Sequence, residues 1–125
     1  MNSVFHFHIP VNDIKRAKEF YEKNFGWCIN KMSDYDYYRI NIVGLDGNKL
    51  PKGNGVINGG MLKREGNEQV MIVIEVNSID EILKKVIKNK GKIIFEKQKI
   101  GEIGYYARFE DTERNIVALW QSIEP

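Results

Sequence analysis

The sequence has few of the residues that commit a chain to covalent cross-links or to a charged partner. It has one cysteine, Cys28, so no internal disulfide can form, and its Gly-Trp-Cys-Ile surroundings predict a buried, unreactive thiol. The net charge of +2 is too small to indicate binding to nucleic acid or to an anionic membrane. No apolar run is long enough to cross a bilayer, and the first residues lack the basic and apolar segments of a signal peptide. We therefore expect a cytoplasmic protein with no nucleic-acid partner and no membrane partner.

What the chain does contain is an internal repeat. A shift of 65 positions lays residues 9–32 over residues 74–97 without a gap, and eight of the 24 pairs are identical. Ordinary residue frequencies give roughly two identities by chance. A period of about half the chain indicates a duplicated unit, with repeats at about residues 3–62 and 69–122 of one domain, 1–125.

Each repeat has the same predicted element order, βαβββ. Alternating apolar side chains predict the strands, and an amphipathic segment after the first strand of each repeat predicts a helix. Asp13 and Ser78 are the predicted N-caps of these helices, and Gly26 and Gly91 are predicted to end them. The predicted strands are 4–11, 27–32, 35–43, 56–62, 69–76, 92–97, 104–110 and 116–122.

The fold class that follows is α+β. One βαβββ repeat leaves one face of its sheet without a helix, so we predict two repeats with curled mixed sheets forming a cleft. The two repeats come from one chain, or a second chain completes the cleft in a homodimer. Gly59-Gly60 inside a strand indicates a bulge or a close backbone approach, and Asp46-Gly47 predicts a hairpin turn. A cleft between two sheets suits a small ligand.

Four segments resemble the vicinal oxygen chelate superfamily, which includes glyoxalase I, extradiol dioxygenases, and bleomycin and fosfomycin resistance proteins. They are HFHIPVNDIKRAKEFYEKNFGW (6–27), VINGGMLKR (56–64), VIEVNSIDEILKKVIKNKGKIIFEK (73–97) and IGYYARFEDTERNIVALWQ (103–121). The last three resemble a subgroup labelled glyoxalase-related. The resemblance covers nearly the whole chain and implies the fold, not a reaction, because the fold hosts lyases, dioxygenases, transferases and binders. One departure is Arg114, where these proteins usually have a glycine with positive φ.

The resemblance also implies where a divalent metal would bind. Metal-dependent members place a ligand, often His, in the first strand of each half and a Glu near the end of each last strand. The first-strand positions fall on His6 and Met71, and the others on Ala118 and near Gly59-Gly60. Three of these four positions cannot hold a divalent ion. We therefore expect no metal cofactor, with His6 a ligand only if a metal is found and otherwise bonded to a neighbouring side chain.

Strand alternation indicates which other side chains face the cleft. His8 shares the face of His6, and Trp120 shares the face of Ala118, where it would stack on a planar ligand or fill the space left by the metal site. Two methionines would add a soft, adaptable lining. The predicted ligand-binding residues are His6, His8, Met61, Met71, Ala118 and Trp120.

The remaining polar and aromatic strand residues have less certain directions. The tyrosine pairs at 37–38 and 105–106 are interpreted as cross-strand packing. Arg39 and Arg108 either anchor an anionic ligand or face solvent. Glu75 is assigned to the helix-facing side or the strand end, so no pair of carboxylates is expected in the cleft.

These observations favour a glyoxalase- or bleomycin-resistance-like protein that binds a small molecule between its repeats without a divalent metal. One alternative is a lyase or isomerase of the same superfamily that acts on a small carbonyl metabolite. It would be metal-free or have an unorthodox metal site, with His6 or His8 as the general base. A second alternative is a non-catalytic module that binds a protein partner. The sequence leaves the ligand open.

Overall fold

The computed structural model describes residues 2–32, 36–42 and 56–123. The chain forms two compact units, one of residues 6–70 and one of residues 71–125 together with residues 1–5. We call them the first-half unit and the second-half unit and describe each by itself. The predicted turn at Asp46-Gly47 lies outside the described residues. Among the described residues, no helix is long and apolar enough to span a membrane.

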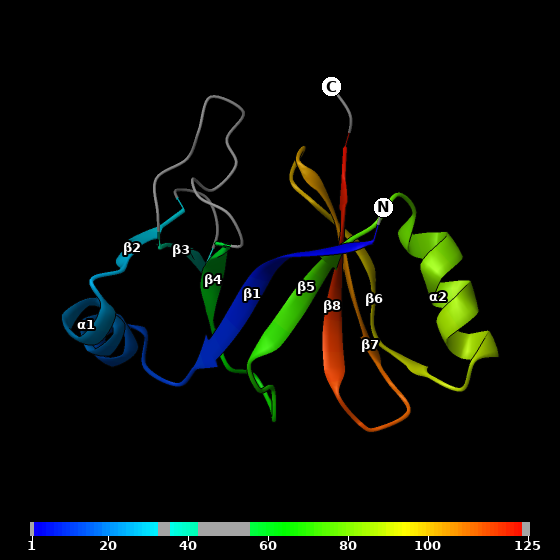
Figure 1. The fold of residues 1–125 in the computed structure, drawn as a ribbon, viewed down its shortest axis with the longest axis horizontal. Helices are drawn as coiled ribbons and strands as arrows, with labels where there is room; N and C mark the ends of the chain where they lie inside the picture. Colours follow the sequence, from blue (N-terminus) through cyan, green and yellow to red (C-terminus); the bar gives the residue numbers. More distant parts are fainter. Residues whose placement is uncertain (1, 33–35, 43–55, 124–125) are drawn as a thin grey trace. The chain divides into compact units, whose positions relative to one another are not determined.

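In its described residues, the first-half unit has one helix and a four-stranded mixed sheet (Figure 1). The strands lie in the order β2-β3-β4-β1, with β1 and β4 parallel and the other neighbours antiparallel. The elements are β1 (Ser3–Val11), α1 (Ile14–Phe25), β2 (Cys28–Lys31), β3 (Tyr37–Asn41) and β4 (Asn58–Lys63).

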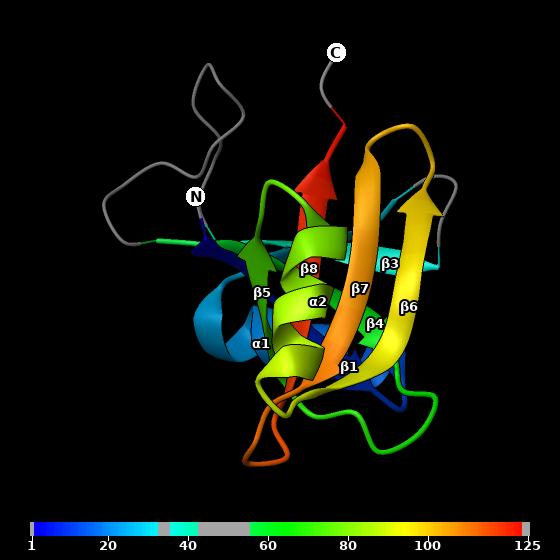
Figure 2. The ribbon, with the colours of Figure 1, turned by 90° about the vertical axis from the view of Figure 1, so that its right-hand side faces the viewer.

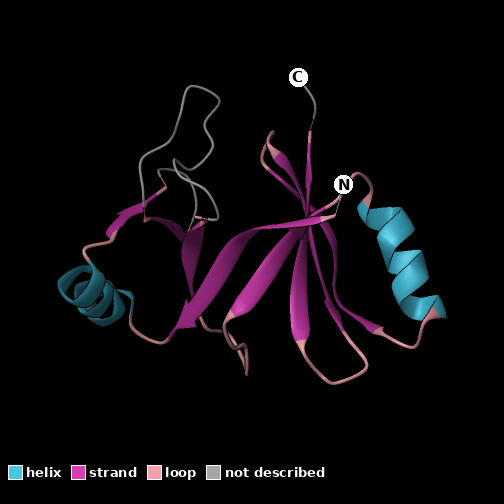
Figure 3. Ribbon diagram, viewed as in Figure 1, coloured by secondary structure: helices cyan, strands magenta, loops and turns pink. Residues whose placement is uncertain are grey.

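The second-half unit repeats this arrangement. Its strands lie in the order β5-β8-β7-β6, with β5 and β8 parallel. Figure 2 shows α2 lying across one face of these strands, and Figure 3 marks the same alternation of strand and helix in both halves. The elements are β5 (Met71–Glu75), α2 (Ile79–Lys88), β6 (Lys92–Ile100), β7 (Gly104–Glu110) and β8 (Ile116–Ser122). The predicted α+β fold of two βαβββ halves is therefore confirmed.

Three of the four predicted helix ends are confirmed. The side chain of Asp13 accepts a hydrogen bond from the Arg16 N–H at 3.0 Å, and that of Ser78 accepts one from the Glu81 N–H at 3.2 Å. Gly26 ends α1 in the left-handed region, with φ 69°.

The prediction for Gly91 is wrong. The C-cap of α2 is Asn89, and the residue with positive φ is Lys90, at 76°. Gly91 is needed for a different reason, because a β-carbon there would lie 2.6 Å from Cγ1 of Val86 and 2.9 Å from the Glu110 carbonyl oxygen. A close backbone approach, not a left-handed turn, therefore requires this glycine.

The turn after β7 keeps the backbone that the resemblance implied. Arg114 has φ 67°, in the left-handed region that favours glycine. Asp111 holds this turn by accepting hydrogen bonds from the Asn115 N–H at 2.9 Å and the Glu113 N–H at 2.7 Å. These two backbone bonds lower the pKa of the Asp111 carboxyl below its ordinary value.

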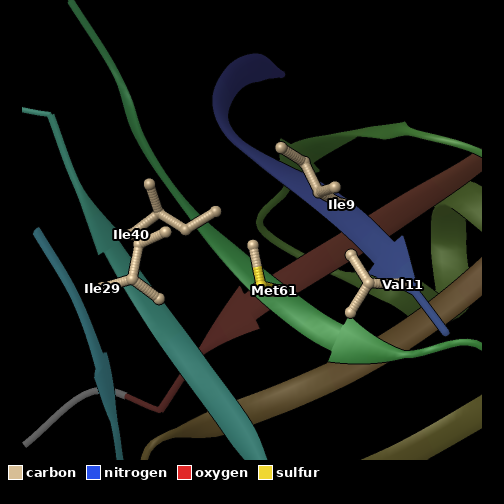
Figure 4. Close-up of a cluster of buried hydrophobic side chains, with 5 residues drawn as sticks. All are labelled: Ile9, Val11, Ile29, Ile40 and Met61. Carbon is tan, nitrogen blue, oxygen red and sulfur yellow. The ribbon is translucent and has the colours of Figure 1, made fainter. Parts of the chain in front are cut away.

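Each helix covers one face of its own sheet. In the first-half unit, Ile14, Ala17 and Tyr21 of α1 pack on a core of Ile9, Val11, Ile29, Ile40 and Met61 (Figure 4). In the second-half unit, Ile79, Ile82 and Leu83 of α2 pack with Val76, Ala107 and Leu119. Ile87, near the end of α2, is 57% exposed. The opposite face of each sheet, which we call its uncovered face, carries the candidate functional residues.

Candidate functional site

The two histidines of β1 lie on the uncovered face of the first-half sheet. Phe7, Ile9 and Val11 of this strand join the core beneath α1, so the alternation of the strand directs His6 and His8 away from the helix. The Tyr37 hydroxyl lies 2.9 Å from Nε2 of His6 and 3.3 Å from Nε2 of His8. We call these three residues the histidine–tyrosine cluster. The expected hydrogen bond between His6 and a neighbouring side chain is present, with Tyr37 as its partner.

Because Tyr37 has a single hydroxyl proton, its hydrogen bonds couple the positions of the protons on the His6 and His8 imidazoles. If Tyr37 donates to one Nε2, its oxygen can accept a hydrogen bond only from an N–H at the other Nε2. When both bonds form, Nε2 of one histidine therefore accepts a hydrogen bond from Tyr37, and Nε2 of the other donates one to it.

The imidazole of His6 is held neutral. Burial, and secondarily the positive charge of Arg39, lower its pKa from 6.5 to about 4. Arg39 is exposed on β3, opposite Gly60 of β4 in the sheet register. Since Gly60 also pairs with His8 of β1, these three positions form one row across the uncovered face.

Cys28 and Met61 do not occupy the positions predicted for them. Cys28 is exposed on β2, where the Asn30 side-chain amide lies 3.2 Å from its sulfur, so the prediction of a buried thiol is wrong. Met61 is fully buried and belongs to the core cluster that Figure 4 draws. This cluster lies on the face of the sheet opposite the histidines. The structure therefore does not bring Met61 together with His6 and His8.

The second-half unit places Met71, Ala118 and Trp120 on its uncovered face. In the register of β5 and β8, Val73 pairs with Ala118 and Glu75 with Trp120. Leu119 joins the core beneath α2, which leaves its neighbours Ala118 and Trp120 on the other side. Met71 is 2% exposed and Ala118 is fully buried, so neither presents a surface to solvent. Trp120 is half-buried.

Trp120 belongs to a directed chain of hydrogen bonds. Its indole N–H donates to Oγ of Ser122 at 3.0 Å, and the Ser122 hydroxyl donates to Oε2 of Glu75 at 3.1 Å. The indole ring also occupies the space where a β-carbon on Gly104 would stand. Glu75 is the last residue of β5 and lies on the uncovered side. Of its two predicted positions, the strand end is confirmed and the helix-facing side is wrong.

An arginine packs beside two aromatic rings on the same face, and the two rings contact each other with centroids 5.8 Å apart. The Arg108 guanidinium carbon is 5.4 Å from the ring centroid of Phe95 and 5.3 Å from that of Tyr106. Nε of Arg108 donates to the Tyr106 hydroxyl at 2.7 Å. Sequence reasoning left the direction of Arg108 open and missed Phe95, which the irregular pairing of β6 with β7 brings opposite Arg108. We call Phe95, Tyr106 and Arg108 the aromatic–arginine group.

The tyrosine pairs therefore divide between the two faces of their sheets. Tyr38 and Tyr105 pack on the cores beneath the helices, as the prediction of packing required. Tyr37 and Tyr106 instead carry the polar contacts of the histidine–tyrosine cluster and the aromatic–arginine group.

The second-half unit also has an open pocket of about 540 Å³. It lies where β5 and β8 end and β7 begins, and Glu75–Asn77, Tyr105 and 121–123 line it. This volume is within the range of small-molecule sites. Trp120 does not line the pocket, but its hydrogen bond to Ser122 connects it to the pocket wall.

The described residues do not form the ligand set of a catalytic metal site. Such a site for Zn²⁺ or Fe²⁺ needs three protein ligands. In the described part of the chain, no three His, Cys, Asp or Glu side chains are grouped to hold an ion. The Nε2 atoms of His6 and His8 both contact Tyr37, and Met71 and Ala118 supply only a thioether and a methyl group.

Comparisons with known proteins agree on the fold. Residues 3–42 match the sequence profile of a family described as bleomycin resistance protein-like N-terminal. No curated protein matches the chain in sequence. A hypothetical protein from Bacillus halodurans C-125 is similar in structure, with TM-score 0.64, 17% identity, and 99% of this chain and 96% of that chain covered.

Two further solved structures extend the comparison. One is a glyoxalase/bleomycin resistance protein/dioxygenase superfamily member from Vibrio splendidus 12B01, with TM-score 0.64, 16% identity, and 98% and 100% coverage of this chain and that one. The other is a variant of methylmalonyl-CoA epimerase from Streptomyces coelicolor in complex with 2-nitronate-propionyl-CoA. For the epimerase the TM-score is 0.62, the identity is 11%, and 97% of each chain is covered. At these identities the likeness shows the fold alone.

Proposed function

Since the chain has the fold of the glyoxalase/bleomycin resistance/dioxygenase superfamily, we propose that it binds a small organic molecule without a divalent metal. The ligand class is a planar ring that carries an anionic group. The observation that carries this proposal is the aromatic–arginine group on the uncovered face of the second-half sheet. The Streptomyces epimerase, which has the same fold, was solved in complex with 2-nitronate-propionyl-CoA, and this supports a small-ligand role.

The chemistry of this group favours such a ligand. A guanidinium presents a planar fork of N–H donors that matches a carboxylate. The Tyr106 hydroxyl accepts from Nε of Arg108 and so helps to fix the plane of this fork. Phe95 and Tyr106 orient the guanidinium and offer ring surface to a planar ligand. In the register of β7 and β8, Arg108 pairs with the buried Ala118 and Tyr106 pairs with Trp120, so Trp120 borders the site.

The histidine–tyrosine cluster favours binding over catalysis. A general base works best when its pKa is near the operating pH, whereas the pKa of His6 is lowered to about 4. His6 is therefore a weak base at neutral pH and is better suited to hydrogen bonding. The enzyme alternative predicts turnover of a small carbonyl compound that is lost in His6→Gln.

Two experiments test the proposal. The first measures binding of small aromatic carboxylates, such as benzoate and 2-naphthoate, by calorimetry and by thermal shift. Arg108→Gln is expected to weaken binding about tenfold or more, because it removes the charge. Arg16→Gln, which removes an exposed arginine from α1, is the matched control and is expected to bind as the wild type does. Equal affinity in Arg108→Gln would refute the assignment, and no ligand-induced stabilisation by any probe would favour the partner-binding alternative.

The second experiment measures metal content by elemental mass spectrometry on protein purified without a histidine tag. The melting temperature is recorded before and after a chelator is added. The proposal predicts no stoichiometric metal and no change in melting temperature. A near-stoichiometric metal, with a lower melting temperature after chelation, would overturn the metal-free assignment. It would favour the enzyme alternative over the binding protein.

Cytoplasmic location and a homodimer complete the proposal. The single exposed thiol of Cys28 suits a reducing compartment. Phe20 and Phe25 of α1 are 56% and 61% exposed, and such apolar surface supports association with a second copy. Light scattering after size-exclusion chromatography distinguishes a dimer from a monomer of 14.6 kDa.

A further inference from the structure

We propose a second binding site, for an organic cation, in the pocket where β5 and β8 end. The site lies beyond the aromatic–arginine group and does not depend on it. Its anchor is the carboxylate of Glu75, which among the described residues is the only charged side chain lining this pocket. The ligand class is a primary ammonium compound with a short apolar or hydroxylated chain.

The hydrogen bonds at Glu75 leave its carboxylate available to a ligand. Oε2 accepts from Ser122, and within the described residues Glu75 has no other hydrogen bond and no ion pair. A carboxylate has about four acceptor sites, so one neutral hydroxyl leaves most of them unused. An ammonium group pairs with such a carboxylate through a charge-assisted hydrogen bond.

Lys97, which approaches the pocket wall, is paired with a carboxylate other than Glu75. Nζ of Lys97 lies over the Tyr105 ring, 4.7 Å from its centroid, and so approaches the pocket wall. Lys97 is paired with Asp80 on α2 at 2.9 Å. Asp80, which does not line the pocket, therefore balances the charge of Lys97. Among the described residues, no cationic side chain is paired with Glu75.

The rest of the lining selects an organic cation over a metal ion. Ca²⁺ needs six to eight oxygen ligands and Mg²⁺ needs near-octahedral geometry, whereas this pocket offers one carboxylate. The side-chain oxygen of Gln121 accepts from the Ile79 N–H at 2.8 Å and is directed to the start of α2. Val76, Ile123 and the Tyr105 ring provide apolar surface for the carbon chain of a ligand.

The structure also supplies a reporter of occupancy. Because Ser122 joins the Trp120 indole to Glu75, a cation at Glu75 changes the hydrogen bond that the indole N–H donates. Trp27, the other tryptophan, lies in the first-half unit, stacked on Tyr21 with ring centroids 5.1 Å apart. The two indole N–H signals in a ¹H–¹⁵N spectrum therefore provide a reporter and an internal control.

The test is an NMR titration with n-butylammonium chloride at constant ionic strength, with n-butanol and sodium butyrate as neutral and anionic probes. We expect a saturable shift of the Trp120 indole signal with n-butylammonium only, and no shift of the Trp27 signal. Glu75→Gln is expected to weaken the interaction about tenfold or more. Glu102→Gln removes an exposed carboxylate from the turn before β7. It is expected to leave the affinity for n-butylammonium and the Trp120 shift unchanged.

Three results would overturn the proposal. They are a Trp120 shift of equal size with n-butanol, an unchanged affinity in Glu75→Gln, and no saturable shift with n-butylammonium. If Glu75→Gln does not fold, Ser122→Ala keeps the carboxylate and removes its neutral partner. That variant is expected to bind n-butylammonium, as followed by the Asn77 amide signal, and loss of binding there would also count against the site. Arg108→Gln is expected to bind n-butylammonium normally, so failure of this site and failure of the aromatic–arginine site are separate results.

Discussion

Gly60 and Tyr37 share one space on the first-half sheet, because the Tyr37 hydroxyl lies where the β-carbon of any other residue at position 60 would stand. The same hydroxyl contacts both His6 and His8. The glycine therefore determines whether the two histidines have their shared partner. This relationship explains why the strand tolerates a residue with low strand propensity.

Gly60→Ala is expected to displace Tyr37 and break its hydrogen bonds to both histidines. We expect a loss of about 1–3 kcal/mol in the free energy of unfolding, as for other additions to a packed site. Urea denaturation measures the loss, and the histidine ring signals in NMR report the broken bonds. The control is Gly66→Ala, whose β-carbon would meet only the flexible Glu68 carboxylate, at 3.3 Å. Unchanged stability and histidine signals in Gly60→Ala would contradict the assignment.

His6 is expected to make stability fall with acidification. Its pKa is about 4 in the folded chain and 6.5 in the unfolded reference, so the unfolded chain takes up the proton first as the pH falls. The contribution is fully present above pH 6.5 and is lost between pH 6.5 and about 4, to a total of about 3 kcal/mol. His6→Gln removes this pH dependence, so the difference between the two proteins isolates it from other titrating groups.

The cause of the low His6 pKa is tested with Arg39→Gln. Burial is the larger cause and the Arg39 charge the smaller, so the pKa of His6 is expected to rise only part of the way towards 6.5. An NMR titration of the His6 ring measures it. A complete return to the ordinary value would show that charge, not burial, dominates.

Arg114→Gly is expected to stabilise the protein. Arg114 has φ 67°, which costs a residue with a β-carbon about 1–2 kcal/mol. The greater freedom of glycine in the unfolded chain offsets part of this, so a net gain of about 0.5–1 kcal/mol is expected in urea denaturation. Glu113→Gly, one position earlier and without positive φ, is the matched control and is expected to lose stability. A loss in both variants would be evidence against strain at Arg114.

Gly91→Ala is expected to destabilise the second-half unit by contact with Val86. The overlap predicts a cost of about 1–3 kcal/mol. In a Val86→Ala background the added cost should be smaller, because the nearest contact at 2.6 Å is gone. Gly26→Ala has no atom within 4 Å of its added β-carbon and is expected to lose stability only through its φ of 69°. If the Gly91→Ala cost is the same in both backgrounds, Val86 is not its cause.

Alternation along single strands predicted the directions of several site residues. The structure confirms that Phe7 and Ile9 lie on the face opposite His6 and His8. It also confirms that Leu119 lies on the face opposite Ala118 and Trp120. The repeat also contained the direction of Glu75, because Glu75 corresponds to Pro10, two positions after His8 and on the same face. The helix-facing prediction missed this signal, whereas the alternative prediction, a position at the strand end, is confirmed.

Other features depend on information that no local pattern carries. Gly59 and Gly60 leave β4 without side-chain alternation, so the direction of Met61 was not readable. The contact of Tyr37 with the histidines requires the register of β3 on β4 and of β4 on β1. Phe95 reaches Arg108 through an irregular pairing of β6 with β7, which a regular alternation does not predict.

The parallel pairing of the first and last strands in each half has a consequence for folding kinetics. His6 pairs with Asn58 and Val73 with Ala118, so each sheet is completed by residues about 50 positions apart in the chain. The entropy of closing such a loop is lost before the parallel contacts form, whereas the β2–β3 and β6–β7 hairpins close locally. Folding of either half is therefore expected to be limited by the arrival of its last strand. Trp120 lies on the last strand of the second half and Trp27 beside the first helix, so a slow fluorescence phase lost in Trp120→Phe and retained in Trp27→Phe would identify that step.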